Sequence, residues 1–272
     1  MELQSTFGER LLPVEVDLLC TFAEVEAPFP LDIPATGATG IEQRMRFRDA
    51  REELTDRGLA DENGPLGVAE DFVFLLRSCT GVLDLVLATE KLDLAVVLMT
   101  HREESLLVTQ RLSEPDGEIR MKAVTLDEAV GDLMRLVPRV EAPRTAPFSL
   151  PRRAIEEAFA AMTDRGDGEP EPLTAQEVDE LLAARGIDDR VTRRMVSHLQ
   201  PVLGNGQAGV ARRDDSEDQW QRSGEELRWL DTDRGRYRLA GDDTWMSVNP
   251  LPREEMRDEL RRLAGQTRSR RG

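Results

Sequence analysis

The sequence has few of the residue types that usually signal catalysis, metal binding or covalent cross-links. Its 272 residues include two cysteines, two histidines and one tyrosine, and aromatic residues make up only 4%. Two cysteines cannot form the disulfide framework of a secreted domain, and Cys20 and Cys79 each lie among apolar neighbours in a helical pattern. We therefore expect two buried free thiols in a reducing compartment, and a core built mainly from Leu and Val.

Long hydrophobic runs are also absent. No stretch approaches the 18 apolar residues of a membrane-spanning helix, and the N-terminus lacks the basic and apolar regions of a secretory signal. The net charge of −17 repels nucleic acid and anionic membranes. With 39% hydrophobic residues in a chain of this length, we expect a globular, cytoplasmic protein with a substantial core.

Candidate catalytic residues are scarce. His101 ends a predicted strand in a solvated turn, and His198 lies on a predicted helix among charged surface residues. No Cys or His stands at metal-ligand spacing from another, and the common hydrolase and nucleotide-binding motifs are missing. Carboxylate pairs such as Glu52 and Glu53 are typical of a solvated face in so acidic a chain. The sequence thus predicts no catalytic residue, no metal site and no cofactor.

The stretch GNGQAG, residues 204–209, matches the glycine pattern of dinucleotide-binding loops. Such a loop works because a strand leads into it and a helix leaves it, with the helix N-terminus facing the pyrophosphate. Here a predicted helix leads in and a strand leaves, so the negative end of a helix dipole would face the phosphate. We interpret the stretch as a helix stop at Gly204 followed by a turn.

Periodicity predicts the elements of the first half. Helices are expected from Pro13, over 39–58 and over 69–79, and again over 126–137. Between them, four strands form an antiparallel meander at 82–88, 93–100, 104–112 and 118–124. The first two strands are apolar on both faces, so both sides of the sheet centre should be covered. Capping boxes are expected at Thr39 and Glu42 and at Thr125 and Glu128.

The second half repeats this order. After a segment with four prolines at 138–151, helices are expected over 152–162, 174–186 and 189–203, the second of them begun by a capping box of Thr174 and Glu177. Strands follow at 207–213, 218–223, 226–231, 236–240 and 244–248, and a last helix at 252–264. Within this meander, Leu227 and Trp229 are expected to face Tyr237 and Leu239 across a hairpin.

These elements predict an α+β fold in two pseudo-two-fold related halves, each with a mostly antiparallel sheet, and the two halves could share one sheet. The predicted division is an N-terminal α+β half at 1–138, a proline-rich connector at 139–151, a C-terminal α+β half at 152–264 and a disordered basic tail at 265–272. With no visible catalytic residues, this architecture favours a binding protein.

Several blocks of sequence, in order along nearly the whole chain, resemble the EspG family of cytoplasmic chaperones of type VII (ESX) secretion in actinobacteria. The blocks are PVEVDLLC, PFPLDIPATGATGIEQRMRFRDAREELTDRGL, VAEDFVFLL, APFSLP, WLDTDRGRYRL and TWMSVNP. There are two departures from the family pattern. The connector TEKL between the first two strands is short where mycobacterial members use a long loop to contact partners, and segment 163–173 is unusually acidic.

The resemblance implies a central, mostly antiparallel sheet flanked by two helical bundles, and a chaperone that is not an enzyme. It would bind the helical tip of PE/PPE-like or WXG100-like substrates, keep them soluble and deliver them for export. The binding groove would lie between the sheet of the second half and the C-terminal helices. We expect it to be lined by Val196, Leu199, Leu203, Met256 and Leu260. An immunity-type neutraliser of a toxic partner, or a hydrolase whose residues assemble only in space, are the alternatives. The cognate substrate, and whether the chain is a monomer or a homodimer, are not encoded in any visible motif.

Overall fold

A computed structural model of the chain describes residues 8–113, 117–153, 156, 175–184, 188–213 and 220–268. The chain forms two compact units. The first comprises Met1–Val137, Ala208–Glu226 and Glu259–Gly272, and the second comprises Pro138–Gln207 and Leu227–Asp258. The boundary expected at residue 138 coincides with a change of unit. In addition, residues 208–226 and 259–272, which lie beyond the predicted N-terminal half, pack with the first unit.

The first unit contains the predicted meander. Its strands lie in the order β1-β5-β4-β3-β2-β7, and β8 also pairs with β7. The neighbours from β1 to β2 pair in antiparallel fashion, which confirms the four predicted strands. The bounds are β1 (Glu9–Leu11), β2 (Gly81–Thr89), β3 (Leu92–His101), β4 (Glu104–Arg111), β5 (Ile119–Ala123), β7 (Val202–Arg212) and β8 (Gln221–Arg222).

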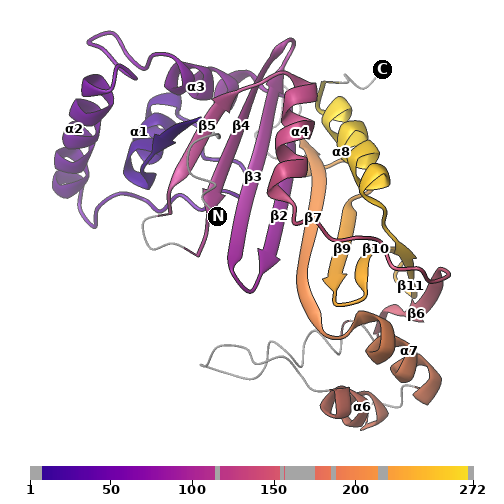
Figure 1. Ribbon diagram of the computed structural model, residues 1–272. Coiled ribbons are helices and arrows are strands. Elements are labelled where there is room, and N and C mark those ends of the chain that lie inside the picture. Colours follow the sequence, from indigo (N-terminus) through magenta and orange to yellow (C-terminus); the bar gives the residue numbers. More distant parts are fainter. Residues whose placement is uncertain are drawn as a thin grey trace. The chain divides into compact units, whose positions relative to one another are not determined.

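Helices cover both faces of this meander, as the apolar sequences of β2 and β3 predict. On one face, α1 (Pro13–Ala23) and α3 (Val68–Ser78) bury side chains such as Leu19 and Phe72 against Val97 and Val108. Helix α2 (Gly40–Asp56) lies beside α1, and α4 (Leu126–Leu136) lies on the other face (Figure 1). There Lys122 of β5 contacts the buried Asp132 of α4 at 2.9 Å.

Polar caps define where these helices begin. Thr125 and Glu128 form the predicted capping box of α4, with each side chain bonded to the other residue's backbone N–H. At α2, the Thr39 hydroxyl accepts from the N–H of Glu42 at 3.2 Å, but the Glu42 carboxylate accepts from Ala38 instead of from Thr39. Thr174 lies outside the described residues.

Two arginines from other segments complete the C-termini of α1 and α3. Arg77 donates from Nε to the carbonyl of Ala23 at 3.0 Å, at the end of α1. Arg213 donates from Nε to the carbonyl of Cys79 at 3.1 Å, directly after α3. A guanidinium at a helix C-terminus satisfies carbonyls that have no partner within the helix and offsets the negative end of its dipole.

Both cysteines are buried free thiols, as predicted. Cys20 lies in α1, where burial and the nearby carboxylates of Asp17 and Glu26 raise the thiol pKa to about 12. Cys79 follows α3 instead of lying within a helix, and burial raises its pKa to about 11.

The second unit contains a smaller sheet in the order β7-β9-β10-β11-β6. Its strands besides β7 are β6 (Phe148–Pro151), β9 (Leu227–Thr232), β10 (Gly235–Gly241) and β11 (Trp245–Pro250). Its helices are α6 (Ala175–Ala184), α7 (Asp189–Leu199) and the first part of α8 (Arg253–Arg268). The proline-rich segment thus ends in an edge strand, where the missing N–H of Pro151 does no harm to a ladder.

The register of the β9–β10 hairpin differs from the prediction by one residue. Tyr237 stands opposite Leu230, and Trp229 stands opposite Arg238. The prediction assumed a five-residue turn, whereas Thr232 pairs with Gly235 across a two-residue loop. Because successive side chains of a strand alternate between faces, Trp229 and Tyr237 lie on opposite faces of the sheet.

A buried ion pair joins this hairpin. The guanidinium of Arg236 bonds both carboxylate oxygens of Asp231 at 2.6 Å, and the two residues are 1% and 2% exposed. The same guanidinium donates to the carbonyl of Pro138 at 3.0 Å and lies 3.1 Å from the sulfur of Met256 in α8. Arg236 therefore connects the start of the second unit, the hairpin and α8.

The interpretation of GNGQAG as a helix stop and turn was wrong. Helix α7 ends at Leu199, and residues 204–209 lie inside strand β7. Their glycines serve packing: a Cβ on Gly206 would lie 2.0 Å from the Trp229 ring, and one on Gly209 would lie 2.6 Å from Arg222 Nη1. With strand on both sides, the stretch has no helix N-terminus to hold a phosphate.

The first four residues of the predicted disordered tail, 265–268, are helical. Helix α8 continues through Arg268, and Thr267 is 3% exposed, with its hydroxyl 2.8 Å from that of Thr100 in β3. Residues 269–272 of the predicted tail lie outside the described residues.

We predict that Gly206→Ala destabilises the protein by about 1–3 kcal/mol, because the added methyl group collides with a fully buried tryptophan. Urea unfolding measures the effect. The matched control is Gly265→Ala in α8, where an added Cβ meets nothing within 4 Å and a better helix former should raise stability by up to about 1 kcal/mol. Equal stability of Gly206→Ala and the wild type would contradict the packing role.

Candidate partner-binding surface

Helix α7 packs on the sheet of the second unit. Asp188 begins the helix, because its side chain accepts a hydrogen bond from the N–H of Arg190 at 2.7 Å. Met195 and Leu199 are 2% and 3% exposed. They pack on one face of the sheet, in a cluster with Leu150, Leu230, Tyr237, Leu239, Met246 and Val248. The helix therefore holds one side against the sheet and also contacts α6.

An aromatic cluster lies where α7 meets the edge strand β6. The rings of Phe148 and His198 are 5.0 Å apart, and Phe148 meets Tyr237 edge-on at 6.3 Å. The Tyr237 hydroxyl lies 3.4 Å from Nδ1 of His198, and the guanidinium of Arg194 lies 5.8 Å from the centre of the Phe148 ring. Phe148 and His198 are half-buried, so the cluster is open to solvent on its outer side.

The surroundings of His198 differ from the prediction of purely charged surface neighbours. Partial burial lowers the pKa of the imidazole, and the positive charges of Arg234 and Arg194 lower it further. A neutral ring that carries its proton on Nε2 can accept a hydrogen bond from the Tyr237 hydroxyl at Nδ1, whereas a protonated ring cannot. The other histidine, His101, meets Phe74 edge-on at 5.6 Å in the first unit.

The residues expected to line a partner groove occupy different environments. Leu203, at the start of β7, is 52% exposed, and Val196 on α7 is half-buried. Leu199 is buried on the inner side of α7, and Met256 and Leu260 of α8 are fully buried. Met256 contacts Arg236, which alternation places on the opposite face of the sheet from Tyr237. Among the five, therefore, Val196 and Leu203 are the residues with accessible apolar surface in the second unit.

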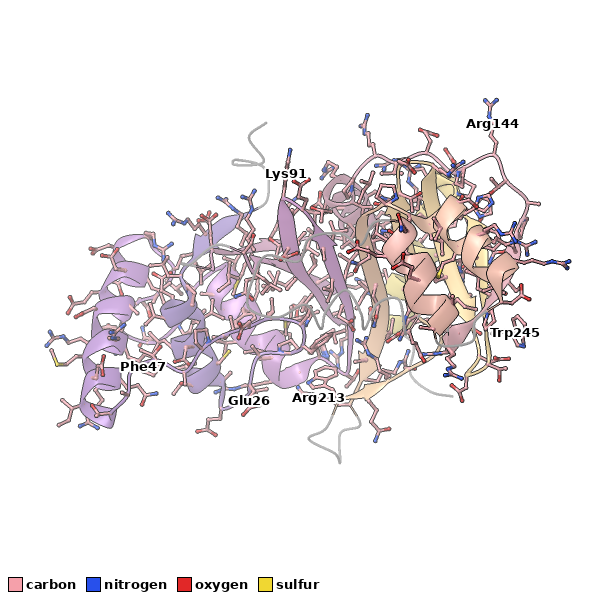
Figure 2. All side chains as sticks on the ribbon, turned by 90° about the horizontal axis from the view of Figure 1, so that it is seen from below. Glu26, Phe47, Lys91, Arg144, Arg213 and Trp245 are labelled. Carbon is pink, nitrogen blue, oxygen red and sulfur yellow. The ribbon has the colours of Figure 1, made fainter. Side chains whose placement is uncertain are left out.

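Phe148 and Trp245 belong to the same unit and were not among the expected binding residues. Trp245, labelled in Figure 2, is 52% exposed at the start of β11, opposite Pro151 of the edge strand. These residues lie in the family-like segments APFSLP and TWMSVNP, but the sequence does not show that their side chains are exposed. A tryptophan in a strand pattern is buried more often than not. Only the folded structure shows that these side chains are accessible.

The turn between β2 and β3 in the first unit is short, as the sequence predicts. Thr89 pairs with Leu92 at the end of the β2–β3 ladder, so Glu90 and Lys91 alone form the turn. Figure 2 labels Lys91 at this tip. A two-residue turn has no length to reach a partner, so contacts through a long β2–β3 loop are excluded.

Within the described ranges, no three His, Cys, Asp or Glu side chains converge in a way that could hold a metal ion. Over the same residues, no helix combines the length and apolar character needed to cross a bilayer. The surface features that stand out in the second unit are exposed apolar and aromatic side chains.

Comparison with known proteins decides the family. The sequence model of the EspG family matches residues 13–262. The chain belongs to the EspG family. No curated protein matches it significantly. Among solved structures, it resembles the Mycobacterium tuberculosis type VII secretion system chaperone EspG5, solved in complex with the PE25–PPE41 dimer. The TM-score is 0.63 at 11% sequence identity, over 96% of this chain and 96% of EspG5.

The match confirms the family resemblance and the α+β fold with a large antiparallel sheet. At 11% identity, the likeness to EspG5 concerns the fold alone. The contact residues of this EspG-family chain must therefore be argued from its own surface.

We predict that His198 titrates below the ordinary imidazole pKa of 6.5, because burial and two arginines disfavour its charged form. With two histidines in the chain, NMR titration gives two imidazole signals, and His101→Gln leaves the one to be assigned to His198.

Linkage fixes the direction of the accompanying stability change. A depressed imidazole pKa favours the folded state above pH 6.5, and this contribution is lost as the pH falls from there through the folded pKa. His198→Gln should therefore flatten the decline of the unfolding midpoint in that window. A His198 pKa at or above 6.5 would refute the assignment.

Proposed function

We propose that this chain is a cytoplasmic chaperone of type VII (ESX) secretion. It binds the helical tip of a PE/PPE-like or WXG100-like secretion substrate, keeps the substrate soluble and delivers it for export, without a catalytic step. The observation that carries the proposal is family membership over residues 13–262. A fold shared over 96% of both chains with a chaperone solved in complex with such a dimer supports it.

The physical basis is the covering of an apolar surface. A helical hairpin with an exposed apolar tip aggregates, since contiguous apolar patches associate in water. A binding partner that buries about 1,200–2,000 Å² in total at that tip prevents this association. The net charge of −17 on this chain then makes complexes repel one another, which keeps them soluble.

We place the binding surface on the second unit, beside α7. Leu203 and Val196 supply apolar area there, and the Phe148 ring supplies a rigid aromatic anchor held by His198 and Arg194. Leu199 and Met256 act beneath this surface as the core that holds α7 and α8 in place. The β2–β3 turn is only two residues long, so it cannot contribute to binding as a longer loop would. The surface beside α7 therefore makes the substrate contacts without it.

Co-expression tests the proposal. A PE–PPE-type heterodimer from the same genome should be insoluble when expressed alone and soluble with this chain. We predict that Leu203→Asp weakens the complex by about thirtyfold or more, the effect of losing a side chain at the centre of an interface. Dissociation of the purified complex on dilution, followed by the fluorescence anisotropy of a labelled substrate, measures the change.

The matched control is Leu112→Asp, which changes a leucine that is 40% exposed in the first unit. It should leave the affinity unchanged. Equal losses in both variants would contradict the assigned surface while leaving the chaperone role intact. A substrate that is equally soluble without the chain, or specific capture of a toxin instead, would overturn the function itself.

A further inference from the structure

Two arginines bring positive charge to the surface of the second unit beside α7. Arg194 lies on α7, and Arg234 lies in the two-residue loop between β9 and β10. Both act on the same imidazole: burial lowers the pKa of His198, and the charges of Arg234 and Arg194 lower it further. This spot is therefore positive, although the chain as a whole has a net charge of −17.

The protein does not neutralise these two arginines itself. Arg238, on the same hairpin, shows the usual arrangement, because its guanidinium lies 3.5 Å from the carboxylate of Glu255. Among the described residues, no carboxylate forms such an ion pair with Arg194 or Arg234, and this includes Asp233 in the same loop. The chain has 53 acidic and 36 basic residues, so carboxylates are not in short supply. Both guanidinium groups are exposed and can receive an acceptor from outside.

An aromatic ring supports one of the two guanidinium groups. Arg194 lies 5.8 Å from the centre of the Phe148 ring, within the range of a cation–π contact. Such a contact uses the face of the guanidinium and leaves its N–H donors available. These donors form a planar fork that matches both oxygens of a carboxylate, and the resulting charge-assisted hydrogen bonds are strong. A carboxylate bound there would also be attracted by the charge of Arg234.

Apolar surface adjoins these charges. Val196 follows Arg194 by two residues on α7 and is half-buried. Phe148 and Val196 both pack at the margin of the apolar cluster between α7 and the sheet. An apolar contact is non-directional, whereas a paired charge fixes the register of one partner on the other. The combination suits a ligand that presents an acidic group next to apolar ones.

We propose that Arg194 and Arg234 bind a carboxylate of the secretion substrate, an Asp or Glu side chain beside the apolar residues of its helical tip. This inference rests on the proposed function, which supplies the substrate and the surface. It adds a rule of specificity. A tip with Lys or Arg at that position is rejected, because like charges would then meet at the interface.

The charge of the rest of the chain sharpens this rule. A surface with a net charge of −17 repels an acidic group almost everywhere, so the two arginines mark the place where a carboxylate is accepted. The same repulsion disfavours nucleic acid as the ligand. It also disfavours a second copy of this chain, which would bring its own −17 charges.

Replacing the arginines in the purified complex tests the site. The probe is a labelled PE–PPE-type heterodimer from the same genome, and its fluorescence anisotropy reports binding to the full chain. The double variant Arg194→Ala with Arg234→Ala should raise the dissociation constant about tenfold or more at low salt. Its affinity should also depend less on salt than that of the wild type, because fewer charges pair in the complex. Arg194→Lys keeps the charge but not the fork, so it should bind with intermediate affinity.

The matched control is the double variant Arg46→Ala with Arg48→Ala in α2 of the first unit. The side chains of these arginines are 60% and 71% exposed, and their removal makes the same change in net charge. This variant should bind the substrate as the wild type does. Circular dichroism confirms that each variant is folded.

Charge reversal identifies the partner group. Arg194→Glu should weaken binding at least about tenfold, and one Asp→Lys or Glu→Lys change at the substrate tip should restore it. Wild-type affinity of the double alanine variant at every salt concentration would overturn the inference. Failure of every tip substitution to rescue Arg194→Glu would do the same. Both results leave the chaperone role intact, because the substrate still needs the chain to stay soluble. A substrate that is equally soluble without the chain would overturn the proposed function, and the inference with it.

Discussion

The second unit depends on one buried ion pair. Arg236 and Asp231 are almost completely removed from water, so neither charge can be left alone without a large cost in free energy. Their bidentate contact across the hairpin requires the observed pairing of β9 with β10, because a slip of one residue would put the two side chains on opposite faces. The constraint extends further, since the same guanidinium also holds the carbonyl of Pro138 and contacts Met256.

This register determines which side chains lie on each face of the sheet. The ion pair, Trp229 and α8 occupy one face, and Tyr237 projects from the other, where α7 packs. Tyr237 in turn positions His198 and the Phe148 ring at the open edge. The block WLDTDRGRYRL, which carries much of the family resemblance, is therefore the framework of the proposed substrate surface and not the surface itself.

Periodicity predicted most of the elements because long amphipathic and alternating patterns leave little choice of structure. The geometry of the turn was harder to predict. The segment DTDRG can close the hairpin with a five-residue turn or with a two-residue loop, and each choice gives a different register. The sequence around it suits both. The prediction for GNGQAG was wrong because Gly206 and Gly209 are needed to make room for Trp229 and Arg222. Those side chains reach the stretch only in the folded sheet.

The candidate site was less predictable still. Leu199 and Leu203 are the same residue type four positions apart, yet one is 3% and the other 52% exposed. The helix ends between them, and that boundary decides which of them is buried. The sequence analysis extended the helix to residue 203 and so could not separate them. Phe148 was out of reach for a similar reason, because nothing local marks β6 as an edge strand.

The two cysteines have a practical consequence. With thiol pKa values of about 12 and about 11, Cys20 and Cys79 are hardly ionised at neutral pH, and both are buried. Thiolates, not thiols, react with maleimides and iodoacetamide. A single cysteine introduced on the surface would accordingly accept a fluorophore or spin label selectively, with both native residues kept in place.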